Sequence, residues 1–202
     1  MDLTDALASR RSVRDYRRDP VDDAVLDEVL AAATRAPSAG FAQGLDLVVL
    51  DTAPSVARYW DTTLPEGPRR DRFRWPGLLR APVLVVVVTD PGAYVRRYGE
   101  PDKAGTGLGG SPDAWPVPYW WVDAGAAVMA LLLAATAAGL GSLLFGLFDH
   151  EAAVAEVLGI PPGRRAVGTV ALGHAAEGRG PTGRSAGRPR RSLGEVVHRD
   201  RW

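Results

Sequence analysis

The 202-residue chain is 46% hydrophobic and carries 24 basic and 24 acidic side chains, a composition that fits one globular domain or two small ones and excludes disordered, collagenous and coiled-coil proteins. It contains no cysteine, which excludes disulfide bonds and thiolate metal sites, and its three histidines lack the spacing of a zinc site. The zero net charge argues against general nucleic-acid binding, because that affinity comes mainly from neutralised phosphates.

The first half of the chain predicts two helices and then two strands with helices between them. Residues 3–8 form a short predicted helix, capped by Asp2 or Thr4. Residues 22–34 place apolar side chains at helical spacing behind an acidic first turn. The patterns that follow predict a strand over residues 45–50, helices over 55–59 and 70–79, and an apolar strand over 83–88 that is buried on both faces.

The second half begins with a segment that has no periodicity. Residues 99–118 are rich in glycine and proline and predict a mobile lid loop. The glycines of residues 105–110 match the dinucleotide-binding fingerprint, but prolines on both sides leave neither the strand nor the helix that this site requires, so we reject it. The remaining patterns predict a helix over residues 119–138, a strand over 142–147, a helix over 149–158 and a strand over 165–172, which completes a layered α/β or α+β domain over residues 1–202.

One uncharged stretch is long enough to cross a membrane. Residues 124–148 exceed the roughly 20 residues that a bilayer requires. Gly139 and Gly141 interrupt this stretch, small residues dilute its hydrophobicity and its flanks are acidic. We therefore expect a helix buried in a core or between two subunits, with a membrane-associated protein as the alternative. The first residues lack a basic and then apolar leader, which predicts a cytoplasmic protein.

Arginines gather near both ends of the chain. In an extended segment Arg10, Ser12 and Arg14 share one face, where two guanidinium groups and a hydroxyl can form a phosphate clamp. A solvated basic surface is the other interpretation of this motif. Residues 174–202 hold seven arginines against three acidic residues, so this basic tail is expected to bind anions.

Four blocks of sequence carry a resemblance that covers most of the chain. They are Arg10-Arg11-Ser-Val-Arg14-Asp-Tyr16; Ala36-Pro37-Ser38-Ala39-Gly40-x-x-Gln43; Asp123-Ala-Gly-Ala-Ala leading to Ala138-Gly139-Leu-Gly141-Ser142; and Leu158-Gly-Ile-Pro161 leading through Val167-Gly-Thr-Val-Ala-Leu-Gly173 to the tail from Arg188 to His198. In this order they resemble the nitroreductase family of flavin enzymes. Residues 51–118 lie outside the resemblance.

The resemblance implies an α+β fold with a central, mostly antiparallel sheet flanked by helices, in an intertwined homodimer. It implies FMN at the subunit interface, NAD(P)H as electron donor and a small planar acceptor such as a nitroaromatic or a quinone. No metal and no catalytic side chain of the protein's own are expected, because the flavin supplies the redox chemistry. The implied cofactor contacts are Arg10, Arg11, Ser12 and Arg14 with Arg188 and Arg190 of the tail at the phosphate and ribityl end, Pro37, Ser38, Ala39, Phe41 and Gln43 from the other subunit, and Gly141 and Ser142 near the ring edge.

The sequence departs from the family pattern at two of these positions. Family members commonly carry an asparagine where this chain has Phe41, and Ala39 stands where a second serine is common. Phe41 therefore has two interpretations, a residue beside the flavin edge or one packed in the subunit interface. A non-catalytic flavin-binding protein and a relative that uses a deazaflavin are the alternative functions. Trp115 is the substrate-side candidate of the lid, together with Phe41, whereas Trp120 and Trp121 are expected to pack in the core or interface.

Overall fold

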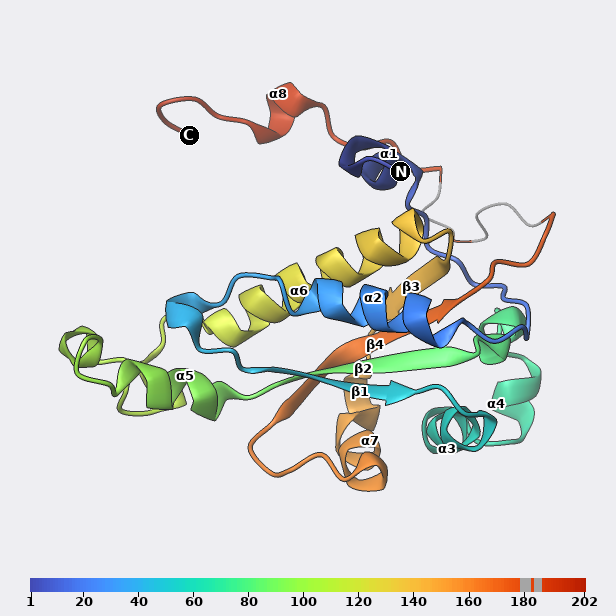
Figure 1. Ribbon diagram of the computed structural model, residues 1–202, viewed down its shortest axis with the longest axis horizontal. Helices are drawn as coiled ribbons and strands as arrows, with labels where there is room; N and C mark the ends of the chain where they lie inside the picture. Colours follow the sequence, from blue (N-terminus) through green and yellow to red (C-terminus); the bar gives the residue numbers. More distant parts are fainter. Residues whose placement is uncertain (179–182, 184–186) are drawn as a thin grey trace.

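The protein folds around a four-stranded antiparallel sheet with helices on both faces (Figure 1). The computed structural model describes residues 1–178, 183 and 187–202. The strands are β1 Leu45–Leu50, β2 Val83–Thr89, β3 Gly141–Phe145 and β4 Arg165–Gly173, in the order β1-β2-β4-β3. Every residue of β2 is buried, as its continuous apolar run predicts. The predicted α+β fold with a mostly antiparallel sheet is thereby confirmed.

One face of the sheet is covered by α2 (Asp23–Ala33) and α6 (Tyr119–Ala137), with α1 (Leu3–Ser9) against the end of α6. Asp22 caps α2 by accepting hydrogen bonds from the amides of Ala24 and Val25. Residues at helical spacing along α6, such as Val128 and Leu131, are buried in the same core as Val85 of β2. These helices lie where the hydrophobic patterns predict them.

α6 is not buried on every side in a single copy of the chain. Tyr119, Val122 and Met129 remain exposed on its outer face. Among the described residues α6 is also the one helix long and apolar enough to cross a membrane. Its packing against the sheet and α2 is that of a core helix of a globular domain, and the same test of length and composition is passed by such helices.

The opposite face is covered by α3 (Ala53–Thr63) and α7 (Glu151–Leu158), around a core that contains Tyr59 and Trp60. The expected helix over 55–59 is longer at both ends. It starts earlier because Thr52 forms a capping box with Ser55. The expected helix over 70–79 is wrong. The chain instead makes α4 (Pro68–Asp71) and a separate 3₁₀ turn at Pro76–Arg80, since Pro76 has no amide hydrogen to continue a helix.

The segment after β2 holds the helix that the sequence patterns missed, α5 (Pro91–Tyr98). Residues 99–118 contain only short 3₁₀ turns, Ala104–Thr106 and Pro112–Ala114. A helix therefore precedes the glycine-rich run in place of the strand that a dinucleotide site needs, which agrees with the rejection of that motif. β3 ends at Phe145 rather than at residue 147, and a 3₁₀ turn at Phe148–His150 leads into α7.

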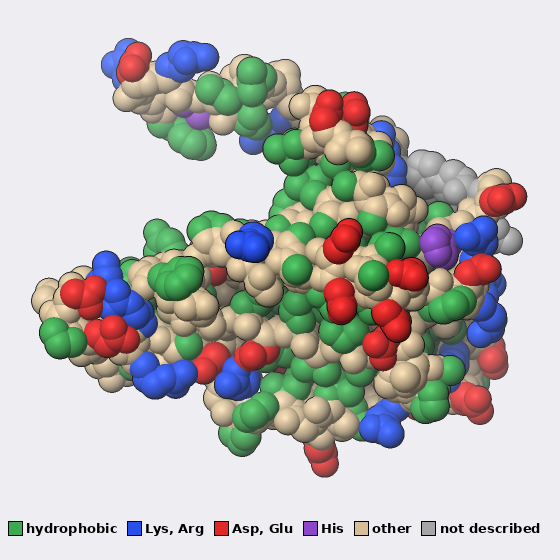
Figure 2. Space-filling view, in the orientation of Figure 1, with side chains coloured by type: hydrophobic (Ala, Val, Ile, Leu, Met, Phe, Trp, Pro, Cys, Tyr) green, Lys and Arg blue, Asp and Glu red, His purple; other side chains and the backbone are tan. Residues whose placement is uncertain are grey.

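The C-terminal residues form an arm that stands away from the body of the molecule (Figures 1 and 2). The arm includes the short helix α8 (Leu193–Val196). Its apolar side chains are exposed in a single copy, namely Leu193, Val196, Val197 and Trp202.

Candidate functional site

The N-terminal arginine segment crosses the start of β3. Ser12 forms a parallel bridge with Ser142, and the Val13 amide donates a hydrogen bond of 3.0 Å to the Ser142 carbonyl. Gly141 permits this approach, because a Cβ atom there would lie 2.9 Å from the Val13 side chain. The structure thus brings Ser12, Gly141 and Ser142 together, as the predicted site requires.

The three arginines of this segment make different contacts. Arg10 ends α1, and Arg11 turns back to donate to the carbonyl of Ala8. Arg14 donates to the Ser12 carbonyl at 3.2 Å, and its guanidinium carbon lies 5.4 Å from the centre of the Trp75 ring. The guanidinium of Arg14 is therefore held beside an aromatic wall.

Ser142 has a buried hydroxyl with no hydrogen-bond partner among the described residues. The residue is 1% exposed. Leaving a buried polar group unpaired costs about 1–3 kcal/mol, so such a group needs an explanation. A ligand that hydrogen-bonds to the Ser142 hydroxyl beside the arginine segment is the explanation that this location offers.

A cavity of about 440 Å³ opens beside Arg14. We call it the Arg14 cavity; its walls come from α3, residues 73–78, β3 and the turn before α7, and include Tyr59, Trp60, Phe73, Trp75, Phe145, Gly146, Phe148 and His150. The indole nitrogens of Trp60 and Trp75 are buried and lack a partner among the described residues. The cavity is thus lined by aromatic rings, with one cation and unused N–H donors.

Sequence reasoning missed most of these cavity residues. Trp60 and Trp75 fall in residues 51–118, where neither a motif nor a resemblance marks them. Phe148 is marked by its backbone, which the sequence does not show. Its φ is +49°, and its side chain, which lines the cavity, is 87% exposed. A bulky residue with positive φ is uncommon and tends to occur at functional sites.

The second predicted group, residues 37–43, forms a tight loop with backbone strain. Gly40, Phe41 and Gln43 have φ values of +61°, +58° and +50°. The Ser38 hydroxyl accepts a hydrogen bond from the Gln43 amide, and the Ala39 amide donates to Asp123 on α6 at 2.8 Å. Phe41 is 73% exposed. The loop therefore holds a phenyl ring outward in a conformation that few non-glycine residues adopt.

The loop covers a smaller cavity of about 210 Å³, lined by Pro37, Ser38, Phe41, Gln43, Tyr94 and Asp123 among others. The Tyr94 hydroxyl donates to the same Asp123 oxygen at 2.8 Å. Burial, followed by the hydrogen bond to the Asp123 carboxylate, raises the pKa of Tyr94 well above its ordinary value. Tyr94 is therefore a neutral donor at physiological pH.

The two predicted groups lie at opposite ends of α6. Ala39 contacts Asp123 in the second turn of α6, whereas Ser12 contacts Ser142 just beyond its last turn. The length of helix between these points is roughly 20 Å at 1.5 Å per residue. Within one copy the loop of residues 37–43 is therefore remote from the arginine segment.

The remaining predicted residues have varied surroundings. Arg188 and Arg190 are exposed on the arm. Trp115 is 7% exposed, contacts the rings of Tyr94, Tyr98 and Trp120, and donates its indole N–H to the Leu108 carbonyl. Its role toward a substrate stays a prediction. The described residues contain no group of three or more potential metal ligands.

Comparison with known proteins connects this geometry to a family. Residues 7–174 match the sequence profile of the nitroreductase family. The chain is 31% identical over 192 residues to a Thermus thermophilus protein named NADH dehydrogenase, covering 88% of each chain. It is 30% identical over 172 residues to the 5,6-dimethylbenzimidazole synthase of Rhodobacter capsulatus, covering 79% of this chain and 77% of the relative.

A solved structure shows the same fold at lower sequence identity. The hypothetical oxidoreductase YcnD from Bacillus subtilis is similar with a TM-score of 0.74 and 22% identity, covering all of this chain and 75% of that one. The family match and the names of the relatives support oxidoreductase activity. The chain belongs to the nitroreductase family.

Proposed function

We propose that the protein is an FMN-dependent oxidoreductase that passes electrons from NAD(P)H to a small planar acceptor such as a nitroaromatic or a quinone. The observation that carries the proposal is the Arg14 cavity, where an arginine and two unused indole N–H groups lie among aromatic walls. Oxidoreductase activity in the nitroreductase family supports the same reaction class.

The residues present fit a flavin. A flat ring with carbonyl oxygens along one edge matches aromatic walls that carry N–H donors and a guanidinium group. The Ser142 hydroxyl, buried and unpartnered among the described residues, lies at the arginine segment, where a ribityl chain has hydroxyls to offer. Arg10 is available for the phosphate, with Arg188 and Arg190 joining it from the arm.

When bound, FMN supplies hydride acceptance from the nicotinamide and electron donation to the acceptor. The protein's own residues bind and orient it. Arg14 would hold positive charge beside the bound ring, and Trp75 would offer its buried indole N–H as a hydrogen-bond donor.

The separation of the two predicted groups supports a homodimer with shared sites. The loop of residues 37–43 is roughly 20 Å along α6 from the arginine segment of its own chain, a separation that favours contact with a flavin on another copy. The exposed apolar face of α6 and the exposed apolar arm supply surfaces that a second copy covers. We therefore propose that Phe41 of one copy faces the flavin held by the arginines of the other.

The test is a spectrum of the purified protein, followed by anaerobic titration with NADH and with NADPH. Flavin absorption bands that bleach with either donor, and recover with a quinone, support the proposal. Bands that do not bleach indicate the non-catalytic flavin-binding alternative. A protein that is colourless and does not take up added FMN contradicts the proposal, and a deazaflavin is then the next cofactor to add.

The relative named 5,6-dimethylbenzimidazole synthase shows that the family includes more than one reaction. An assay of the reduced protein for 5,6-dimethylbenzimidazole separates that activity from electron transfer. An enzyme of the proposed class forms none of this product.

A further inference from the structure

The loop of residues 37–43 is held in place by α5, the helix that the sequence patterns missed. A Cβ atom on Gly40 would lie 2.8 Å from the Tyr98 ring, and one on Gly44 would lie 2.6 Å from the Tyr94 ring. Two tyrosines of α5 therefore pack directly against the backbone, one at the centre of the loop and one just after its last residue. A side chain at either glycine would force this contact apart.

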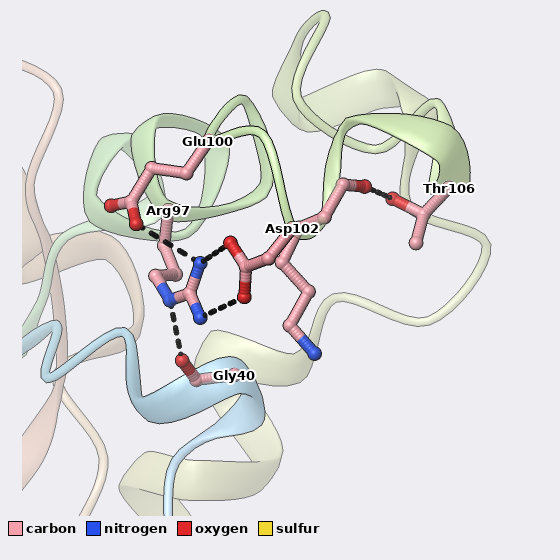
Figure 3. Close-up of polar contacts among 6 residues, drawn as sticks. Gly40, Arg97, Glu100, Asp102 and Thr106 are labelled. Atoms are coloured by element: carbon pink, nitrogen blue, oxygen red, sulfur yellow. Dashed lines mark hydrogen bonds and ion pairs between the residues drawn. The ribbon is translucent and has the colours of Figure 1, made fainter.

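Arg97 of α5 adds a polar contact at the centre of the turn. Its Nε donates to the Gly40 carbonyl at 2.8 Å, and its two terminal nitrogens each donate to one Asp102 carboxylate oxygen at 2.7 Å (Figure 3). A fourth hydrogen bond, of 3.1 Å, joins Arg97 to Glu100. The Arg97 side chain is 23% exposed, whereas that of Asp102 is 59% exposed. The guanidinium is thus oriented by a two-pronged carboxylate contact from residues 99–118.

The Gly40 carbonyl belongs to the peptide group that decides where Phe41 points. Rotation of this group changes ψ of Gly40 and φ of Phe41 together. Its other end is also held, because the Phe41 amide donates to the Ser38 carbonyl at 2.9 Å. With both ends bonded, the peptide group keeps Phe41 at φ +58°, a conformation that costs free energy for a phenylalanine.

Arg97 is suited to this task for a second reason. The bidentate hydrogen bond to Arg97 lowers the pKa of Asp102 below its ordinary value, so the carboxylate stays ionised through the neutral range. The Arg97 side chain lies outside the Arg14 cavity and the smaller cavity under the loop. It therefore acts on the loop only through the Gly40 carbonyl.

We propose that Arg97 is a positioning residue for the cofactor site: it fixes the Gly40–Phe41 peptide group, and Asp102 sets its orientation, so that residues 99–118 control how Phe41 is presented to the flavin of the partner copy. This inference rests on the proposed function for the identity of the cofactor. The positioning itself is a property of the loop.

The chain offers a matched control one residue away. Arg96 is on the same helix and pairs with Asp90 at 2.9 Å, but its side chain is 70% exposed and, among the described residues, forms no hydrogen bond with the loop. Arg97→Gln and Arg96→Gln each remove one cation and its ion pairing from α5, with Asp102 and Glu100 in the first case and with Asp90 in the second. Only the first releases the Gly40 carbonyl.

The first measurement is amide hydrogen exchange in the full-length protein, which does not depend on the cofactor. In Arg97→Gln the amides of Phe41 and Gln43 should exchange at least tenfold faster than in wild type, while Arg96→Gln leaves them unchanged. Equal exchange in the two variants overturns the proposal. If the wild type does not bind FMN, the proposed function is wrong. The exchange rates of the two variants still test whether Arg97 positions the loop.

The second measurement is made on the FMN-loaded protein. Arg97→Gln should weaken FMN binding up to about tenfold, because loss of the hydrogen bond to Gly40 lowers the fraction of copies whose loop is in the binding conformation, and should shift the flavin midpoint potential. Arg97→Lys should recover part of the affinity, because an ammonium group reaches one acceptor but lacks the fork. A merely structural role lowers the melting temperature and leaves the potential unchanged, which contradicts the proposal.

Asp102 supplies a further check and a fallback if Arg97→Gln does not fold. Asp102→Asn should weaken FMN binding less than Arg97→Gln does. The double variant should bind FMN no more weakly than Arg97→Gln alone, because Asp102 acts through Arg97. Additive losses would show that Asp102 acts by another route.

Discussion

Replacing Phe41 with asparagine tests the loop and the cofactor site at once. Phe41 occupies the left-handed region at φ +58° and is 73% exposed, so the substitution removes no contact from the core of a single copy. Asparagine tolerates this region better than phenylalanine, and its amide can hydrogen-bond to a flavin edge. We expect Phe41→Asn both to stabilise the fold and to tighten FMN binding.

The two effects have separate magnitudes. A left-handed conformation costs a non-glycine residue about 1–2 kcal/mol, and recovering about half of this raises the melting temperature by roughly 1–4 °C in a chain of this size. One hydrogen bond to the ring edge contributes about 0.5–1.5 kcal/mol, which corresponds to roughly twofold to tenfold tighter binding. Both changes have the same sign.

The assay compares Phe41→Asn with Phe41→Gly, by FMN titration and thermal unfolding at one protein concentration. Glycine relieves the same backbone strain but has no side-chain amide to bond the flavin. It also raises the conformational entropy of the unfolded chain, which lowers stability. The difference in FMN affinity between the two variants isolates the hydrogen bond. If Phe41→Asn binds FMN more weakly and melts at a lower temperature than wild type, Phe41 packs in the subunit interface and our assignment to the flavin edge is wrong.

Four further predictions concern other parts of the molecule. Arg10→Ala and Arg190→Ala should each weaken FMN binding at least tenfold with unchanged circular dichroism, and unchanged affinity in both would refute a shared phosphate site. The exposed apolar face of Tyr119–Ala137 predicts an obligate dimer, which a folded monomer in sedimentation at micromolar concentration would contradict. Trp75→Phe removes an N–H that has no partner among the described residues, so it should weaken FMN binding without lowering stability; a loss of stability alone would count against the cavity as a ring site. The hydrogen bond from Arg165 lowers the pKa of Glu151 below its ordinary value of 4.5, so the ionised carboxylate stabilises the fold above that pH and this stabilisation is lost on acidification. In Glu151→Gln the melting temperature should therefore change less between about pH 5 and 3 than in wild type, and an unchanged pH profile would show that the Glu151–Arg165 ion pair does not contribute to stability.

The parts of the fold that could be predicted are those where local pattern and burial coincide. The helix over residues 22–34 and the strand over 83–88 bury one regular set of apolar positions, and the structure places them within a residue of the expected bounds. α5 escaped prediction because two of its tyrosines pack on glycines that are at least 50 residues away in the sequence. Such contacts leave no periodic trace in the sequence.

The candidate site divides in the same way. Arginine and glycine motifs marked Ser12 and Gly141, which the structure brings together. Trp75 and Arg97 carried no motif, since their importance comes from an unpaired indole N–H and from one carbonyl on a distant turn. Both features depend on which groups meet in the folded chain, and no local sequence pattern encodes that.

The distance along α6 between the loop and the arginine segment links cofactor retention to assembly. If each flavin is held by groups from two chains, separation of the chains halves every site, and mass action then makes the bound fraction of FMN depend on protein concentration. Added FMN would in turn favour association. Expression level would thereby act as a regulator of activity, because a dilute pool of chains retains less flavin.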